Sequence, residues 1–251
     1  MKILRKNSIL YCMCLTLILS GCGQNVGVLI EKGDVEFNKG NYTDALGFYN
    51  EAVKNEAENY LCYYKRGFSY EKLEAFEKAI NDYNVAIELN PKFPMSFNNR
   101  GVLLSSMGNN ELGIEDINTA IMIDSTVSIF YNNRGLAKSN LELYDESIID
   151  YNYAIKLDTS NWMFYANRGI SFQFLEMFQE SIFDFDKANE LNGLDESVLL
   201  NRGVSKYLME DISGALNDWE VSMNLGNEDA KSYYNSVKNK LKDSTPPLPQ
   251  E

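Results

Sequence analysis

Five arginines and five aspartates recur in this chain at a fixed interval, and their residue types could do chemistry. Successive arginines stand 34 residues apart, and each aspartate lies 16 residues after an arginine. Because a half-buried guanidinium needs a carboxylate partner, the pattern predicts structural ion pairs, within one repeat or between two. The alternative is a ladder of arginines that binds the carboxylates of a ligand. The ten residues are Arg66, Arg100, Arg134, Arg168, Arg202, Asp82, Asp116, Asp150, Asp184 and Asp218.

A glycine follows each of these arginines, and a sixth glycine, Gly33, follows Lys32 one period earlier. A single period held over several copies is the signature of a solenoid, in which each repeat buries its apolar face against its neighbours. Within each repeat, apolar residues recur at helical spacing on both sides of a short break, which predicts a pair of antiparallel helices. The glycine register gives six repeats: 26–59, 60–93, 94–127, 128–161, 162–195 and 196–229.

Small residues occupy positions 8, 20 and 27 of nearly every repeat, and large residues occupy positions 4, 17 and 24. This arrangement resembles the tetratricopeptide repeat family over residues 26–229. The resemblance implies an all-α fold, a right-handed superhelical solenoid of six helix pairs. We expect residues 230–242 to form a capping helix on the last repeat, followed by a disordered proline-rich tail at 243–251.

The same resemblance implies a binding groove, because in this family the first helix of each repeat lines the concave face. Apolar and amide side chains occupy the corresponding positions, and an amide can both donate to and accept from a peptide backbone. The alternative is that the asparagines orient the neighbouring arginines or face water. The candidate groove residues are Tyr64, Phe68, Asn98, Asn99, Asn132, Asn133, Asn167 and Asn201. Further apolar residues of these positions are Val102, Leu136, Ile170, Phe174, Val204 and Tyr207.

The first 21 residues are similar to the signal peptide of a bacterial lipoprotein. Three basic residues precede an apolar run from Ile9 to Leu19, which is too short to span a membrane. The run ends in a Leu-Ser-Gly-Cys sequence, and the resemblance implies that Cys22 is lipidated after cleavage and that residues 22–25 form a tether. Gly23 is not the aspartate that signals retention in the inner membrane, which favours the outer membrane facing the periplasm. The alternative is an ordinary signal peptide in which Cys22 is incidental.

Several classes of function are not expected from this composition. The chain has no histidine, and once residues 1–22 are set aside Cys62 is the remaining cysteine, so we expect no catalytic residue, metal site or cofactor. The glycines recur inside helices, so they form no phosphate-binding loop. A net charge of −13 disfavours nucleic acid and favours protein partners with neutral or basic segments.

These observations predict a scaffold that is lipid-anchored in the bacterial cell envelope. Its groove would bind segments of other envelope proteins and hold them at the membrane to which Cys22 is attached. Two alternatives remain at this stage. One is a soluble intracellular adaptor with the same repeats, and the other is an enzyme that acts on the cell wall through acidic groove residues.

Overall fold

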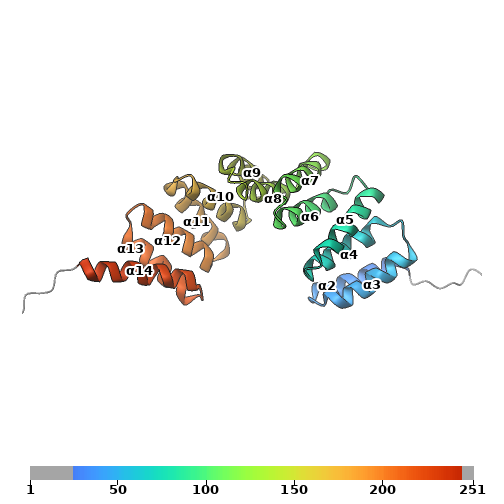
Figure 1. Cartoon of the computed structure of the whole chain (residues 1–251), viewed down its shortest axis with the longest axis horizontal. Helices are drawn as coiled ribbons and strands as arrows, with labels where there is room; N and C mark the ends of the chain where they lie inside the picture. Colours follow the sequence, from blue (N-terminus) through green and yellow to red (C-terminus); the bar gives the residue numbers. More distant parts are fainter. Residues whose placement is uncertain (1–24, 245–251) are drawn as a thin grey trace, which may run out of the picture. The chain divides into compact units, whose positions relative to one another are not determined.

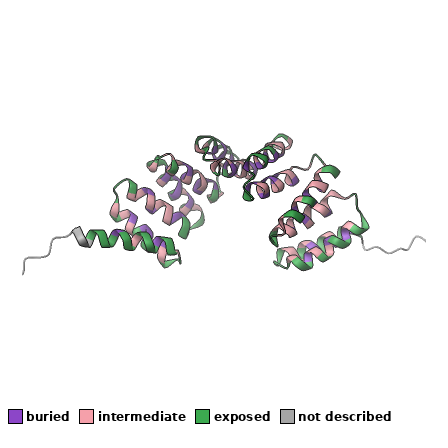
Figure 2. Cartoon of the chain, viewed as in Figure 1, coloured by how far each residue is buried: buried purple, intermediate pink, exposed green. Residues whose placement is uncertain are grey.

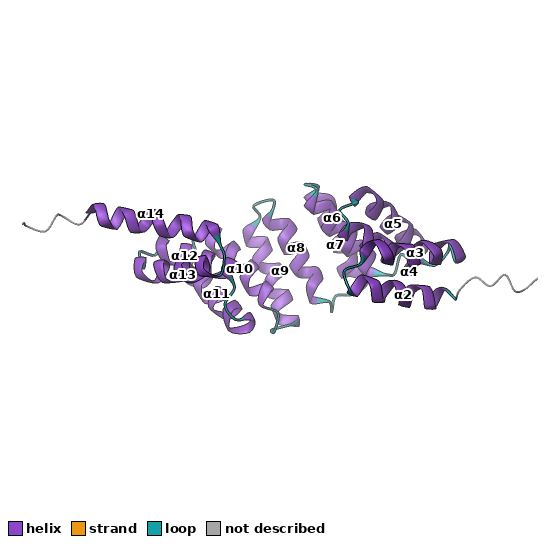
Figure 3. Ribbon diagram, turned by 90° about the horizontal axis from the view of Figure 1, so that it is seen from below, coloured by secondary structure: helices purple, strands orange, loops and turns teal. Residues whose placement is uncertain are grey.

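The protein is described by a computed structural model that covers residues 25–244, and within them every regular element is an α-helix (Figures 1 and 3). The predicted signal peptide, Cys22, most of the tether and residues 245–251 of the tail lie outside this range. The helices are α2 Val26–Asn38, α3 Tyr42–Asn55, α4 Tyr60–Lys72, α5 Phe76–Leu89, α6 Pro94–Ser106, α7 Asn110–Ile123, α8 Ser128–Ser139, α9 Tyr144–Leu157, α10 Trp162–Phe174, α11 Phe178–Asn192, α12 Glu196–Leu208, α13 Ile212–Asn224 and α14 Glu228–Ser244. The all-α prediction is confirmed.

The chain divides into two compact bodies, Met1–Lys92 and Phe93–Glu251. The first body contains α2 to α5, and the second contains α6 to α14. In both bodies, consecutive helices form pairs that match the predicted repeats in order. Each helix buries a narrow stripe and leaves its other side exposed, as the colouring of Figure 2 shows.

The periodic glycines let the two helices of a repeat approach closely. A Cβ atom on Gly33 would lie 2.4 Å from the ring of Tyr49, and one on Gly203 would lie 2.5 Å from the indole nitrogen of Trp219. Both aromatic side chains are almost fully buried. The small residue on the first helix therefore makes room for the large residue on the second, and the pair is packed without a void.

The turns between repeats depend on polar side chains, because only one repeat carries the family's proline. Asn59, Asn161 and Asp195 cap α4, α10 and α12 by accepting hydrogen bonds from backbone amides. Just before two of the repeats, Asp124 and Asp158 accept from the amides two residues ahead at 2.9 Å, which closes an Asx turn. These residues end one helix and start the next.

The turns inside the repeats place one residue in the left-handed region of backbone conformation. Gly40 and Gly108 occupy this place in the first and third repeats, with φ of 83° and 87°. The other four repeats place a glutamate there, with φ between 57° and 65°. A residue with a Cβ atom is disfavoured in this conformation by about 1–2 kcal/mol. The four glutamates are Glu74, Glu142, Glu176 and Glu210.

Replacing Glu210 by glycine is expected to raise the free energy of unfolding by about 0.5–1 kcal/mol, because glycine removes the strain at a small cost in chain entropy. Urea denaturation followed by circular dichroism measures the change. A lower midpoint in the variant would mean that the Glu210 side chain stabilises the turn by more than its backbone strain costs.

The C-terminal helix α14 is longer than the sequence predicted. It spans Glu228–Ser244 and not 230–242, so the proline-rich tail begins later than 243. The helix can continue to Ser244 because the first proline is Pro246, and a proline disfavours helical conformation only in the residue before it. Ala230 and Val237 of α14 pack on Trp219 of α13, and the rest of the helix is largely exposed (Figure 2).

Candidate functional site

The structure brings together every predicted arginine and aspartate. In each repeat from the second to the sixth, the arginine on the first helix donates two hydrogen bonds to the aspartate on the second. The donor–acceptor distances lie between 2.5 and 2.9 Å. The side chains of Asp150, Asp184 and Asp218 are only 1% exposed. Such bidentate geometry is what makes arginine suited to half-buried ion pairs.

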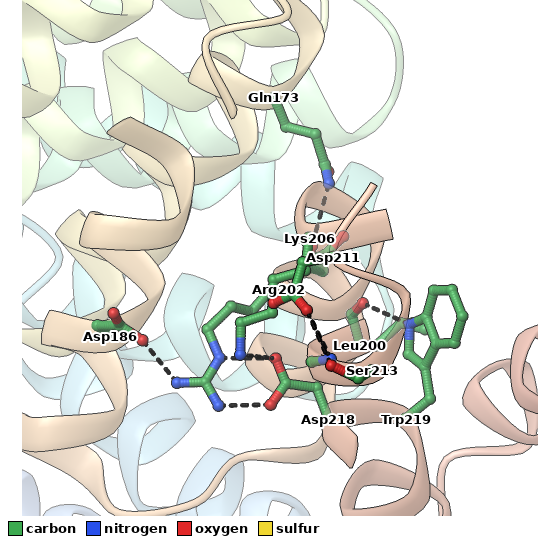
Figure 4. A network of polar contacts seen from close by, with 11 residues as sticks. Gln173, Asp186, Leu200, Arg202, Lys206, Asp211, Ser213, Asp218 and Trp219 are labelled. Carbon is green, nitrogen blue, oxygen red and sulfur yellow. Dashed lines mark hydrogen bonds and ion pairs between the residues drawn. The ribbon is translucent and has the colours of Figure 1, made fainter. Parts of the chain in front are cut away.

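Most of these arginines also contact the preceding repeat. Arg202 Nη1 donates to Asp186 at 2.6 Å, and Figure 4 shows this guanidinium between Asp186 and Asp218. Arg134 makes the corresponding contact with Asn118 at 2.7 Å. Lys206 adds a second cation to Asp218 at 2.8 Å. The aspartate partner thus lies within the repeat, and the third contact couples that repeat to the one before it.

The charge states of these groups follow from their surroundings. Hydrogen bonding to Asp218 raises the pKa of the Arg202 guanidinium. Burial raises the pKa of the Asp184 carboxyl, and the hydrogen bonds from Arg168 oppose that rise. With the guanidinium groups engaged on two sides, the arginine ladder is a structural element and offers little to the carboxylates of a ligand.

The asparagines form a network among themselves. Asn167 donates to Asn132 Oδ1 at 2.9 Å, and Asn133 donates to Asn98 Oδ1 at 3.0 Å, so the amides connect the first helices of successive repeats. Asn98 also donates to Asn99 at 3.0 Å. These bonds are an outcome that neither of the two interpretations of the asparagines included.

Burial corrects part of the predicted groove. Asn98 and Asn132 are each 4% exposed, so a bound peptide would not reach them directly. Asn201 donates to the Ser197 carbonyl of its own helix at 2.9 Å. Asn167 is half-buried and remains at the surface of a pocket described below. The sequence could not distinguish these cases, because the same residue type recurs at the same position in each repeat.

Tyr64 and Phe68 belong to an aromatic cluster in the first body. The ring of Phe68 stacks on Phe37 with centroids 4.9 Å apart, and Lys72 Nζ lies 5.0 Å from the Phe68 centroid. Nearby, Glu71 accepts a hydrogen bond from Tyr83, and burial raises the pKa of the Glu71 carboxyl. The two predicted groove residues are therefore half-buried and supported by neighbouring rings.

A pocket of about 280 Å³ opens in the second body between α8, α9 and α10. Three of its residues, Leu136, Ile170 and Phe174, hold groove positions that the resemblance indicated. The second-helix residue Tyr144 was not expected there, although an aromatic residue recurs at its position in several repeats. The full lining is Leu136, Ser139, Asn140, Tyr144, Tyr151, Asn167, Ile170 and Phe174.

Other kinds of site were sought in the described residues. Over residues 25–244, no group of three or more cysteines, aspartates and glutamates is arranged to hold a metal ion. No helix in the same range combines the length and the apolar character needed to cross a membrane. Cys62 is fully buried, and burial raises the pKa of its thiol to about 11.

Comparison with known proteins identifies the repeats. Profiles described as tetratricopeptide repeat match residues 60–93 and 129–161. Stress-induced-phosphoprotein 1 of Caenorhabditis elegans is 43% identical over 51 residues, which are 20% of this chain and only 16% of that protein.

Solved structures share the fold. A tetratricopeptide repeat protein from Parabacteroides merdae is 20% identical with a TM-score of 0.67, covering 91% of this chain and 90% of that one. PilF of Pseudomonas aeruginosa is 14% identical with a TM-score of 0.75, covering 84% and 97%. PilW, described as a widely conserved type IV pilus biogenesis factor, is 14% identical with a TM-score of 0.78, covering 83% and 97%. Repeat period, helix pairing and profile matches agree: the chain belongs to the tetratricopeptide repeat family, whose repeats form scaffolds for protein–protein interaction.

Proposed function

We propose that this protein is a lipid-anchored scaffold of a bacterial cell envelope, without catalytic activity of its own. Its groove binds segments of other envelope proteins and localises them at the membrane that holds the lipid. The observation that carries the binding role is the open pocket formed by the first helices α8 and α10 together with α9. Its apolar walls and amide rim suit an extended polypeptide, which offers both side chains and backbone groups.

The anchor rests on the sequence of the first 22 residues. A basic start, a short apolar run and the residues before Cys22 follow one another in the order that a lipoprotein signal requires. A lipid on Cys22 would hold the groove beside the membrane and raise the effective concentration of any partner there. That PilW has a described role in pilus biogenesis is compatible with an envelope role here, but at 14% identity it supports the fold alone.

In-cell photocrosslinking tests the groove. A photoreactive residue at Leu208 probes a first-helix position that is 50% exposed and lies outside the pocket. Met122, which is 78% exposed on the second helix α7, serves as the matched control. We expect capture of an envelope protein from Leu208 and none from Met122. Equal capture from both positions would contradict a groove-specific partner.

Metabolic labelling with an alkyne fatty acid tests the anchor. We expect label on the wild-type chain and none on the Cys22→Ser variant. Labelling that survives the substitution would exclude Cys22 as the attachment site. A chain that is never labelled and stays in the cytosolic fraction would support an intracellular adaptor in place of an envelope scaffold.

A further inference from the structure

The pocket in the second body has the size of a site for one large side chain. Its volume of about 280 Å³ falls just below the range of about 300–1,000 Å³ that is usual for small-molecule sites. All eight lining residues are uncharged, and the lining contains no carboxylate that would neutralise a buried cation. An uncharged side chain of a partner is therefore the fitting occupant.

One wall of the pocket is an exposed aromatic surface. The rings of Tyr144 and Phe174 stack with centroids 4.7 Å apart and planes inclined by only 5°. Phe174 is nevertheless 61% exposed, and within the described part of the chain Tyr144 is its one ring contact. A further ring could extend this stack and remove apolar surface from water.

Two amides supply polar groups at the same pocket. Asn167 uses its NH₂ group on Asn132 at 2.9 Å, and Asn140 uses its NH₂ group on Asn110 at 3.4 Å. Over residues 25–244 the structure gives neither carbonyl oxygen a donor. Both are thus acceptors for an N–H group, such as the indole N–H of tryptophan or a backbone amide beside an inserted ring.

Two glutamates border the pocket along the chain. Glu142 lies between the lining residues Asn140 and Tyr144, and Glu176 lies two residues beyond Phe174. Both are exposed, and neither makes an ion pair within the described residues. Both occupy the left-handed turn position at which Gly108 occurs in the third repeat, so each adds a carboxylate where glycine would be less strained.

The surrounding repeats are strongly acidic. Residues 128–195 carry eleven acidic residues against five basic ones. Several of these cations are already paired, since Arg134 and Lys138 both bind Asp150. The electrostatic field at the pocket therefore favours a basic partner and disfavours a second copy of this acidic chain.

From these observations we propose that the pocket binds one aromatic side chain of an extended partner segment, with lysine or arginine residues on both sides of it. The ring packs against Phe174, and the flanking cations meet Glu142 and Glu176. This inference rests on the proposed scaffold function and specifies the chemistry of the segment that is bound.

The test uses the full chain and fluorescein-labelled heptapeptides of the form Gly-Ser-Lys-X-Lys-Ser-Gly, measured by fluorescence anisotropy at low ionic strength. With tryptophan at X, we expect binding about tenfold tighter than with alanine, because an apolar ring is buried. Replacing both peptide lysines by glutamate should abolish measurable binding. Equal binding of the tryptophan and alanine peptides would overturn the proposal.

Matched variants locate the site. Phe174→Ala should weaken binding of the tryptophan peptide about tenfold, whereas Phe183→Ala should not, although Phe183 on α11 is 67% exposed. Because Phe174 is exposed, the variant should keep the wild-type melting temperature. If it does not, Phe174→Leu preserves apolar contact while removing the ring, and it should still weaken binding. Equal losses in the Phe174 and Phe183 variants would overturn the pocket assignment.

The rim is tested with the double variant Glu142→Gln and Glu176→Gln, for which we expect about fivefold weaker binding at low salt and no difference at high salt. Glu210→Gln has the same backbone conformation in the next repeat and should leave binding unchanged. A double variant that binds like the wild type would contradict the role of the rim. If no peptide binds while crosslinking from Leu208 still captures an envelope protein, the pocket assignment fails and the scaffold function stands.

Discussion

Replacing Asp150 by alanine is expected to lower the free energy of unfolding by about 3–5 kcal/mol. Asp150 accepts hydrogen bonds from Arg134 Nε and Lys138 Nζ, both at 2.9 Å, and its side chain is only 1% exposed. Without it, two half-buried cations lose their carboxylate. Arg134 also contacts Asn118 of the preceding repeat, so the loss should spread beyond one helix pair.

Two companion variants interpret this result, and thermal denaturation measures all three. Asp150→Asn keeps the size and one carbonyl acceptor, so we expect a smaller loss. Asp186→Ala removes a carboxylate that also binds an arginine but is 55% exposed, and we expect a change below about 1 kcal/mol. An Asp150→Ala variant as stable as the wild type would mean that the ion pair contributes nothing to the fold.

Replacing Gly101 by alanine is expected to lower the free energy of unfolding by about 2 kcal/mol. The new Cβ would lie 2.7 Å from the backbone oxygen of Gly113 and 2.9 Å from Ile117 Cγ1. A backbone atom cannot rotate away, so α6 and α7 must separate, and overpacking of this kind costs about 1–3 kcal/mol. This loss exceeds the gain in helix propensity of up to about 1 kcal/mol.

Gly47 provides the matched control, because it also lies inside a helix but has no neighbouring atom within 4 Å of an added Cβ. Gly47→Ala should therefore raise the stability by about 1 kcal/mol. Chemical denaturation of both variants gives the comparison. A Gly101→Ala variant that gains stability as Gly47→Ala does would show that helix approach at Gly101 is not limiting.

The repeat period was enough to predict the helices and their pairing. Small and large residues alternate between fixed positions, and a glycine such as Gly203 has space only because Trp219 packs against it. Because that packing is local to one repeat, it leaves a periodic trace in the sequence. The end of α14 was less predictable, since Ser244 still tolerates helical conformation two residues before Pro246.

The groove could be predicted only in part. Asn132 and Asn167 belong to the same recurring pattern, yet Asn132 is buried as an acceptor while Asn167 lies at the pocket surface. Burial of a side chain depends on the neighbouring repeat and not on its own residue type. The same holds for the Tyr144–Phe174 stack, whose members are 30 residues apart and come from successive repeats.

The sequence by itself determined the all-α architecture, the spacing of the helix pairs and the matching of each arginine with an aspartate, because these depend on interactions within one repeating unit. Only the tertiary structure decided which amides are exposed, where the pocket opens and which carboxylates border it. Those properties arise where two repeats meet, at distances that the one-dimensional period does not encode.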